Sequence, residues 1–305
     1  MWLVYAFFSA ALLGCYDSFK KASLRGNAVI PVLFLNTLFS SLLLAPLLWM
    51  SAHGEWLDGT PFHAAPGGWE QHRLILLKSC IVLSSWICGY FAMKHLPLTI
   101  VGPVNATRPV MVLVGAMLVF GERLNLYQWI GVLLAVAAFF MLGRSSRKEG
   151  IDFRHDRWVW CLVAAALLGA CSGLYDRYLM APVSSGGAGL DRMMVLGWYN
   201  IYQCGMMAVV LLVLWWPRRH QGSPFRWHWT IPLISIFLVS ADFLYMYALT
   251  YDDAMISIVS MIRRGRVVVS FLFGALVFHE KNLRSKAFDL LLVLLGMVFL
   301  WLGSR

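Results

Sequence analysis

Apolar residues follow one another in ten long runs along the chain, separated by short polar connections. The runs cover about 2–21, 28–50, 74–95, 97–120, 125–143, 158–179, 193–216, 227–250, 254–279 and 283–303. A helix needs about 20 apolar residues to cross the hydrocarbon core of a bilayer. Strands of membrane barrels are shorter, at roughly 10 residues, and alternate apolar with polar positions. The pattern therefore predicts an all-α polytopic membrane protein with ten transmembrane helices.

The composition supports this class. Hydrophobic residues make up 60% of the 305 residues and charged residues 13%, whereas soluble domains carry roughly 25% charged residues. A net charge of +10 would suggest nucleic-acid binding in a soluble protein. No basic stripe with interleaved aromatic residues lies outside the apolar runs, so we expect a lipid bilayer and no nucleic acid as partner.

The sequence contains no signature of an enzyme or a metal centre. It lacks GxSxG, HExxH and Walker motifs. All six cysteines fall inside apolar runs and none forms a CxxC pair, which indicates packing rather than metal binding or disulfides. We expect a protein that is not an enzyme and that uses no metal or cofactor.

The two halves of the chain resemble each other. AALLG occurs at 10–14 and again at 165–169, and RPVMVLVGAMLVFGE (108–122) aligns without gaps on RVVVSFLFGALVFHE (266–280). Five helices per half is an odd number, so the second copy must be inverted in the bilayer. We expect one five-helix repeat over 1–143, a basic connecting loop over 144–157 and a second repeat over 158–305. Inverted repeats place a substrate site near the midplane, where the repeats meet.

Lys and Arg are distributed unevenly between the two sides of the predicted membrane. One side would carry 15 of them and the other five, namely Arg73, Arg123, Arg177, Arg192 and Arg305. The positive-inside rule makes the richer side cytoplasmic. Both termini would then be extracytoplasmic.

Cations inside the apolar runs are the strongest candidates for function, because a charge at the bilayer centre costs at least roughly 2.5–3.5 kcal/mol on insertion scales. Arg108 and Arg266 lie almost at mid-span and align in the repeat. Asn105 lies one turn before Arg108, and Arg263 takes the place of Asn105 in the second repeat. A guanidinium fork binds carboxylate or phosphate bidentately, so these residues predict an anion clamp. Arg264 would point elsewhere.

Acidic residues offer an alternative, structural explanation for these arginines. Asp242 is the only acid well inside a run, and Asp17 and Asp176 lie near run ends. Asp242 and Asp17 would balance the charge of the arginines or couple transport to a proton or counter-substrate. Because acids are fewer than cations, unpaired positive charge remains and favours an anionic ligand.

Other polar and aromatic residues have two interpretations each. Trp86 and Tyr90 are four residues apart on one helix face and could line a substrate cavity or form part of an aromatic belt. For Lys78 we favour a side chain that extends to the interface. Three further expectations concern helix ends and packing: interfacial anchors at Lys20 and Lys21, solvated helix-end ion pairs at Glu122 and Glu280, and close helix packing at the small-residue segment 169–173.

The ten predicted helices, the two five-helix halves and the helix ends LVFGERL and LVFHEKN resemble the EamA-like branch of the drug/metabolite transporter superfamily. The resemblance implies a bundle of two inverted repeats that works by alternating access. It also implies a central cavity lined by helices three, four, eight and nine, which would bring together Trp86, Asn105, Arg108, Asp242, Arg263 and Arg266. Related carriers of triose phosphates and nucleotide sugars bind phosphate with cations on helices four and nine.

Together these observations predict a secondary transporter in the inner membrane of a bacterium. Its substrate would be a small organic anion or a phosphorylated metabolite. Alternatives are an exporter of amino acids or similar metabolites, a flippase for a lipid-linked phosphate, which would need a lateral opening between helices, and an intramembrane lipid enzyme, for which no catalytic constellation is visible. The oligomeric state stays open.

Overall fold

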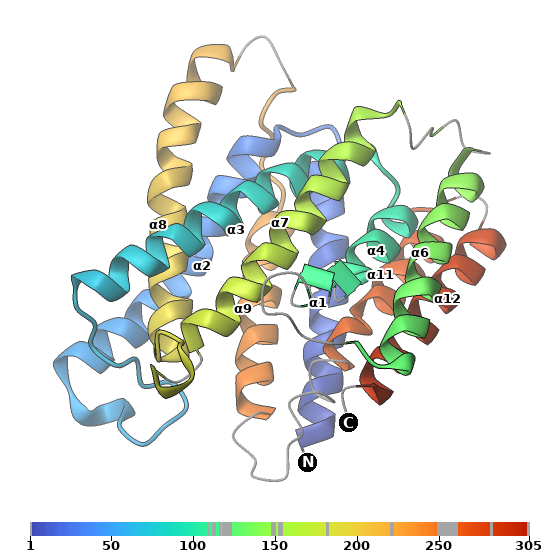
Figure 1. Ribbon diagram of the computed structural model, residues 1–305. Coiled ribbons are helices and arrows are strands. Elements are labelled where there is room, and N and C mark those ends of the chain that lie inside the picture. The colour runs from blue at the N-terminus through green and yellow to red at the C-terminus, as the bar shows by residue number, and fades with distance from the viewer. Residues whose placement is uncertain are drawn as a thin grey trace.

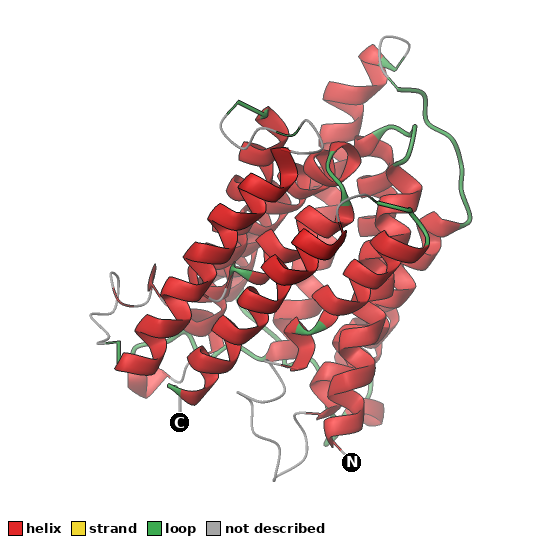
Figure 2. Ribbon diagram, turned by 90° about the vertical axis from the view of Figure 1, so that its right-hand side faces the viewer, coloured by secondary structure: helices red, strands yellow, loops and turns green. Residues whose placement is uncertain are grey.

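The computed structural model describes residues 2–303 except 109, 112–113, 116, 118–123, 148–150, 152–154, 181–182, 220–222, 249–261 and 281–282. Over this part of the chain the fold is all-helical and no strand is present (Figure 2). The α-helices are α1 (Trp2–Leu24), α2 (Val29–His53), α3 (Trp69–His95), α4 (Leu98–Ala106), α6 (Leu126–Arg147), α7 (Arg157–Met180), α8 (Arg192–Val210), α9 (Thr230–Ala248), α11 (Arg266–Leu276) and α12 (Leu283–Leu302).

Five helical segments are long and apolar enough to cross a membrane: Val29–His53, Trp69–His95, Arg157–Met180, Arg192–Arg218 and Leu283–Leu302. Two shorter apolar helices, Leu126–Leu142 and Thr230–Tyr245, accompany them. The expected all-helical class is therefore confirmed for the described residues. The connection between α6 and α7 is shorter than the loop predicted over 144–157. Helix α6 continues to Arg147, and α7 begins at Arg157.

Helices far apart in the sequence pack side by side. The main pairs are α1 with α9, α3 with α7, α2 with α8, and α6 with α12. The helices α4 and α11 pack against each other, and α11 also contacts α1. Both termini lie at the same end of the bundle (Figure 1).

The fourth and ninth apolar runs are interrupted at equivalent positions. In the first, Thr107 donates its backbone N–H to Val104 and accepts from Val110. In the second, Gly265 donates to Ile262 and accepts from Val268. These i→i−3 bonds are of the 3₁₀ type, which in the middle of a helix often marks a functional hinge. Each break directly precedes one of the two aligned arginines, Arg108 and Arg266.

Two of the charged residues are placed differently from expectation. Lys78 does not extend to the interface: it is 6% exposed, forms an ion pair with Asp176 and lies over the Tyr199 ring at 5.0 Å. Burial without a counter-ion would be costly, so the lysine turns to the nearest acid. Lys20 is likewise buried, with its ammonium 4.2 Å from the Tyr90 ring centroid, instead of anchoring at the interface.

Glu280 is not a solvated helix-end ion pair. Its carboxylate accepts hydrogen bonds from the backbone N–H groups of Leu98 (2.6 Å) and Thr99 (2.8 Å), and from the Thr99 hydroxyl. The first N–H groups of a helix lack partners within the helix, and negative charge is favourable there. The second half of the chain thus caps α4 in the first half. The equivalent Glu122 lies outside the described residues.

Candidate functional site

A cavity of about 330 Å³ lined by several charged side chains lies where α1, α4, α7, α9 and α11 meet. Four of its lining residues are arginines, which is unusual for the interior of an apolar bundle. The lining is formed by Leu13, Asp17, Gly102, Asn105, Ala106, Arg108, Gly169, Gly173, Leu238, Tyr245, Arg263, Arg264, Arg266 and Val267. The cavity therefore brings together Asp17, Asn105, Arg108, Arg263 and Arg266.

Arg108 reaches the cavity from the segment that follows the break after α4. Its guanidinium passes across α7, where Nη2 donates to the carbonyl oxygen of Ala165 at 3.4 Å. It fits there because residue 169 is glycine: a Cβ at Gly169 would lie 2.8 Å from the Arg108 guanidinium carbon. The Nε of Arg108 is buried and has no hydrogen-bond partner.

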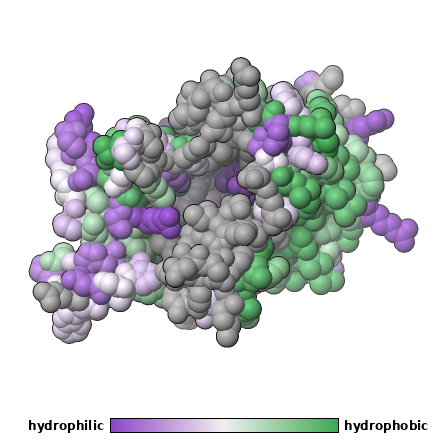
Figure 3. All heavy atoms as spheres, turned by 60° about the horizontal axis from the view of Figure 1, so that its bottom comes forward, coloured by the Kyte–Doolittle hydropathy of each residue, from purple (hydrophilic) through white to green (hydrophobic). Residues whose placement is uncertain are grey.

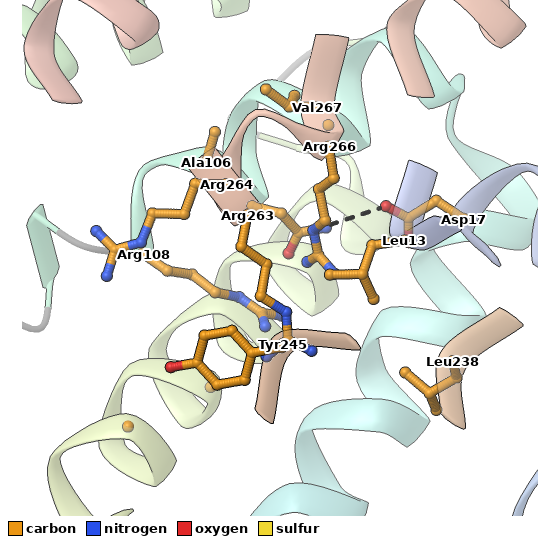
Figure 4. A pocket seen from close by; sticks show the side chains of 14 residues that line it. Leu13, Asp17, Ala106, Arg108, Leu238, Tyr245, Arg263, Arg264, Arg266 and Val267 are labelled. Carbon is orange, nitrogen blue, oxygen red and sulfur yellow. Dashed lines mark ion pairs between the residues drawn. The ribbon is translucent and has the colours of Figure 1, made fainter. Parts of the chain in front are cut away.

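Arg263 lies on the opposite wall. Its guanidinium forms an ion pair with Asp242 and stacks over the Tyr245 ring at 4.3 Å. Asp242 therefore belongs to the site through Arg263, although it is not among the lining residues. The Nε of Arg263, like that of Arg108, is buried without a partner. Figure 4 shows the two side chains converging beside Tyr245.

Arg266 points to the α1 side of the cavity. Its Nε lies 3.9 Å from the Oδ2 of Asp17, which also accepts a hydrogen bond from the Ser270 hydroxyl at 3.1 Å. Arg264 is exposed, and its side chain points away from the other three (Figure 4). The side chains thus form a converging group of three arginines, with Arg264 to one side.

Among the described residues, the charges around the cavity do not cancel. The three converging arginines face two carboxylates, Asp17 and Asp242, so the sum is 3 − 2 = +1, and Arg264 adds a further positive charge to one side. Arg108 has no acid within ion-pair distance among the described residues. Electrostatic attraction is stronger in a medium of low dielectric constant than in water. The arrangement can therefore attract and hold an anion. The buried Oδ1 of Asn105 also lacks a partner, and as an acceptor it suits a donor group of a ligand rather than the anionic group itself.

Two expected site residues lie elsewhere. Trp86 and Tyr90 do not line the cavity, and no residue of α3 does. Tyr90 is fully buried in the main apolar core, and Trp86 packs against that core. Both therefore contribute to packing in this structure.

Several lining residues are not predicted by the sequence analysis, among them Tyr245, Gly169 and Gly173. Tyr245 lies three residues after Asp242, which places it near the same helix face. Gly169 and Gly173 were assigned to helix packing alone, but they also make room for the cavity. The sequence feature that indicates this role is a pair of small residues, four positions apart, on a helix that faces a predicted intramembrane arginine.

Among the described residues, no group of three or more His, Cys, Asp or Glu side chains could hold a metal ion.

Figure 3 shows the end of the molecule that carries the termini. It is hollowed near its centre, and hydrophilic side chains are visible inside the hollow. Much of one flank in the same view is apolar, with a few hydrophilic side chains along its edge.

Comparisons with known proteins are consistent with this architecture. Residues 1–144 match the model of the EamA-like transporter family. A search of curated proteins gives no match. A solved structure titled only "Crystal structure of protein" is similar, with a TM-score of 0.59 and 16% sequence identity over 98% of this chain and 96% of that chain. At that identity the similarity concerns the fold alone.

Proposed function

We propose that this chain, whose residues 1–144 belong to the EamA-like transporter family of the drug/metabolite transporter superfamily, carries a small organic anion or a phosphorylated metabolite across the membrane by alternating access. Members of that family are membrane transporters of small molecules. The observation that carries the proposal is the excess of guanidinium groups over carboxylates among the described residues around the cavity.

The hydrogen-bonding capacity of the arginines supports an anionic ligand. The Nε groups of Arg108 and Arg263 are buried and without partners, although a guanidinium offers five N–H donors. Leaving a buried donor of a charged group unsatisfied costs more than about 1–3 kcal/mol. A carboxylate or phosphate between the two side chains would satisfy these donors, and it would also reduce the repulsion between like charges.

The breaks in the fourth and ninth runs support a moving site. Broken helices near the midplane are where secondary transporters bind their substrates. Here the breaks at Thr107 and Gly265 have the same hydrogen-bond pattern. Small changes of backbone angles at these two positions would reorient Arg108 and Arg266 without disturbing the helices that pack outside them.

The helix contacts support a duplicated architecture with related halves. The counterparts in the two halves are α1 and α7, α2 and α8, α3 and α9, α4 and α11, and α6 and α12. Exchanging each helix for its counterpart turns the pair α1–α9 into α7–α3 and the pair α2–α9 into α8–α3, and both of the resulting pairs are in contact. The pairs α2–α8, α4–α11 and α6–α12 map onto themselves. Gly14 contacts the segment around Arg266 as Gly169 contacts Arg108. We infer two repeats over 1–143 and 158–305 with the site between them.

Asp242 has a role in coupling within this proposal. An anion that binds Arg263 competes with Asp242 for the same guanidinium. The displaced carboxylate would stay buried without its counter-charge, and buried carboxylates of this kind are neutralised by taking up a proton. Anion binding would thus favour proton binding at Asp242, and Asp17 would play the same part for Arg266.

The test is thermal stabilisation of the purified protein by phosphates, carboxylates, amino acids and cations. A ligand that binds the folded state raises its stability by mass action. We expect stabilisation by anions, its loss in Arg108→Gln and a smaller change in Arg264→Gln, which removes the same charge from a side chain that points away. Stabilisation by zwitterions or cations alone, or anion binding unchanged in Arg108→Gln, would contradict the proposal.

A further inference from the structure

A second hollow, an apolar groove of about 620 Å³, adjoins the arginine cavity. It is formed by α1 and by the segment 262–269, which includes the start of α11, and every lining side chain is apolar. The lining residues are Val4, Phe7, Phe8, Ala10, Ala11, Ile262, Gly265, Val268 and Val269. The same two segments line the arginine cavity with Leu13, Asp17, Arg263, Arg264, Arg266 and Val267.

The partition between groove and cavity is thin. Gly265 lines the groove, while the residues on either side of it in the chain, Arg264 and Arg266, line the cavity. The two segments touch at Gly14, where a Cβ would overlap the side chain of Val269 and come within 3.2 Å of the Arg266 carbonyl oxygen. Small residues at helix contacts allow such close approach in membranes. The cavity and the groove are therefore the two sides of a single helix contact.

The groove is open at the surface of the bundle. Phe7 and Phe8 are 62% and 59% exposed, and Val268 on the facing wall is 38% exposed. A surface of this composition on a membrane-spanning bundle contacts lipid chains. A molecule could therefore reach the groove sideways from the bilayer, without first entering water.

We infer that the anion carried by this protein is amphiphilic, with a phosphate or carboxylate head between the arginines and an alkyl chain in the groove. The inference rests on the proposed function and names the substrate class for the same site. It is based on complementarity. Among the described residues the cavity has an excess of positive charge, and every side chain that lines the groove beside it is apolar. The cavity volume of about 330 Å³ is near the lower end of the roughly 300–1,000 Å³ of small-molecule sites, which suits a head group.

The experiment measures binding of methyl, butyl and octyl phosphate to the protein in lipid nanodiscs by thermal stabilisation. Burial of one methylene contributes about 0.8 kcal/mol, so the affinity should rise about fourfold for each methylene that enters the groove. Partitioning into the nanodisc lipid also depends on chain length, and therefore variants are compared in the same nanodiscs.

Two variants fill the groove from opposite walls, Ala11→Phe and Val268→Trp. The matched control Ala137→Phe adds the same bulk at an exposed position of α6, away from the groove. We expect the gain per methylene to fall in both groove variants and to persist in the control. An equal gain in all four proteins would overturn the inference.

The proposed function can fail separately in the same data. Methyl phosphate has almost no chain and reports on the arginine cavity alone. Suppose that methyl phosphate stabilises the wild type and that Ala11→Phe and Val268→Trp leave the chain-length dependence unchanged. The proposed anion site is then supported, and the inference of an amphiphilic substrate is overturned. If no alkyl phosphate of any length binds, both proposals are overturned.

Discussion

Replacing Glu280 by glutamine tests the capping of α4 across the two halves of the chain. The Glu280 carboxylate accepts from the N–H groups of Leu98 and Thr99 and from the Thr99 hydroxyl. Glutamine keeps the length of the side chain and one acceptor oxygen, but it removes the negative charge. The substitution therefore perturbs the cap, and it also removes a negative charge beside Lys21, which lines the same pocket as Glu280.

The expected loss follows from these three bonds. Hydrogen bonds to a charged group contribute roughly 1.5–3 kcal/mol each, whereas neutral ones contribute about 0.5–1.5 kcal/mol. Three bonds at the lower value sum to about 4.5 kcal/mol, and a glutamine oxygen would retain one or two neutral bonds worth about 1–2 kcal/mol. Because Glu280 is partly exposed, we expect the free energy of unfolding to fall by about 2–3 kcal/mol.

The assay is reversible unfolding in mixed micelles of detergent and dodecyl sulfate, followed by circular dichroism. Glu70→Gln is the matched control, since its pair with Arg73 is exposed and spans one helical turn. Pairs of that kind contribute about 0.3–0.5 kcal/mol. The capping argument is refuted if Glu280→Gln is no less stable than Glu70→Gln.

Two further substitutions test local features. His279 has a backbone φ of 50°, a left-handed conformation that costs other residues roughly 1–2 kcal/mol relative to glycine, and the aligned residue of the first repeat is Gly121. His279→Gly should therefore raise the unfolding free energy by about 1 kcal/mol, and unchanged or lower stability in the same assay would contradict this. Lys78→Met should lower it by about 3 kcal/mol, because Asp176 loses its counter-charge. Adding Asp176→Asn should restore part of the loss; no recovery in the double variant would show that Lys78 matters for packing instead.

Much of the fold and of the site follows from local patterns. Apolar runs of about twenty residues predict the helices, and the gapless match of 108–122 with 266–280 identifies Arg108 and Arg266 without any structure. The structure places both in one cavity, with Arg263 and Asn105 beside them. Charges in an apolar run are informative because their burial is so costly.

Partners brought together by tertiary packing could not be predicted in this way. Lys78 meets Asp176, which is 98 residues away in the chain, and Glu280 meets Thr99, which is 181 residues away. Spacing along one helix shows which residues share a face, but it does not show what that face contacts. Trp86 and Tyr90 share a face as predicted, yet Tyr90 lies in the main core and Trp86 packs against it.

The ion pair between Arg263 and Asp242 also bears on how the chain enters the membrane during synthesis. The ninth apolar run carries Arg263, Arg264 and Arg266, and central arginines cost roughly 2.5–3.5 kcal/mol each on insertion scales. Helix α9, with Asp242, leaves the ribosome first. A carboxylate is therefore already within the preceding helix when the arginines arrive, and the two segments can partition into lipid as a hairpin that carries less net charge than its second arm alone.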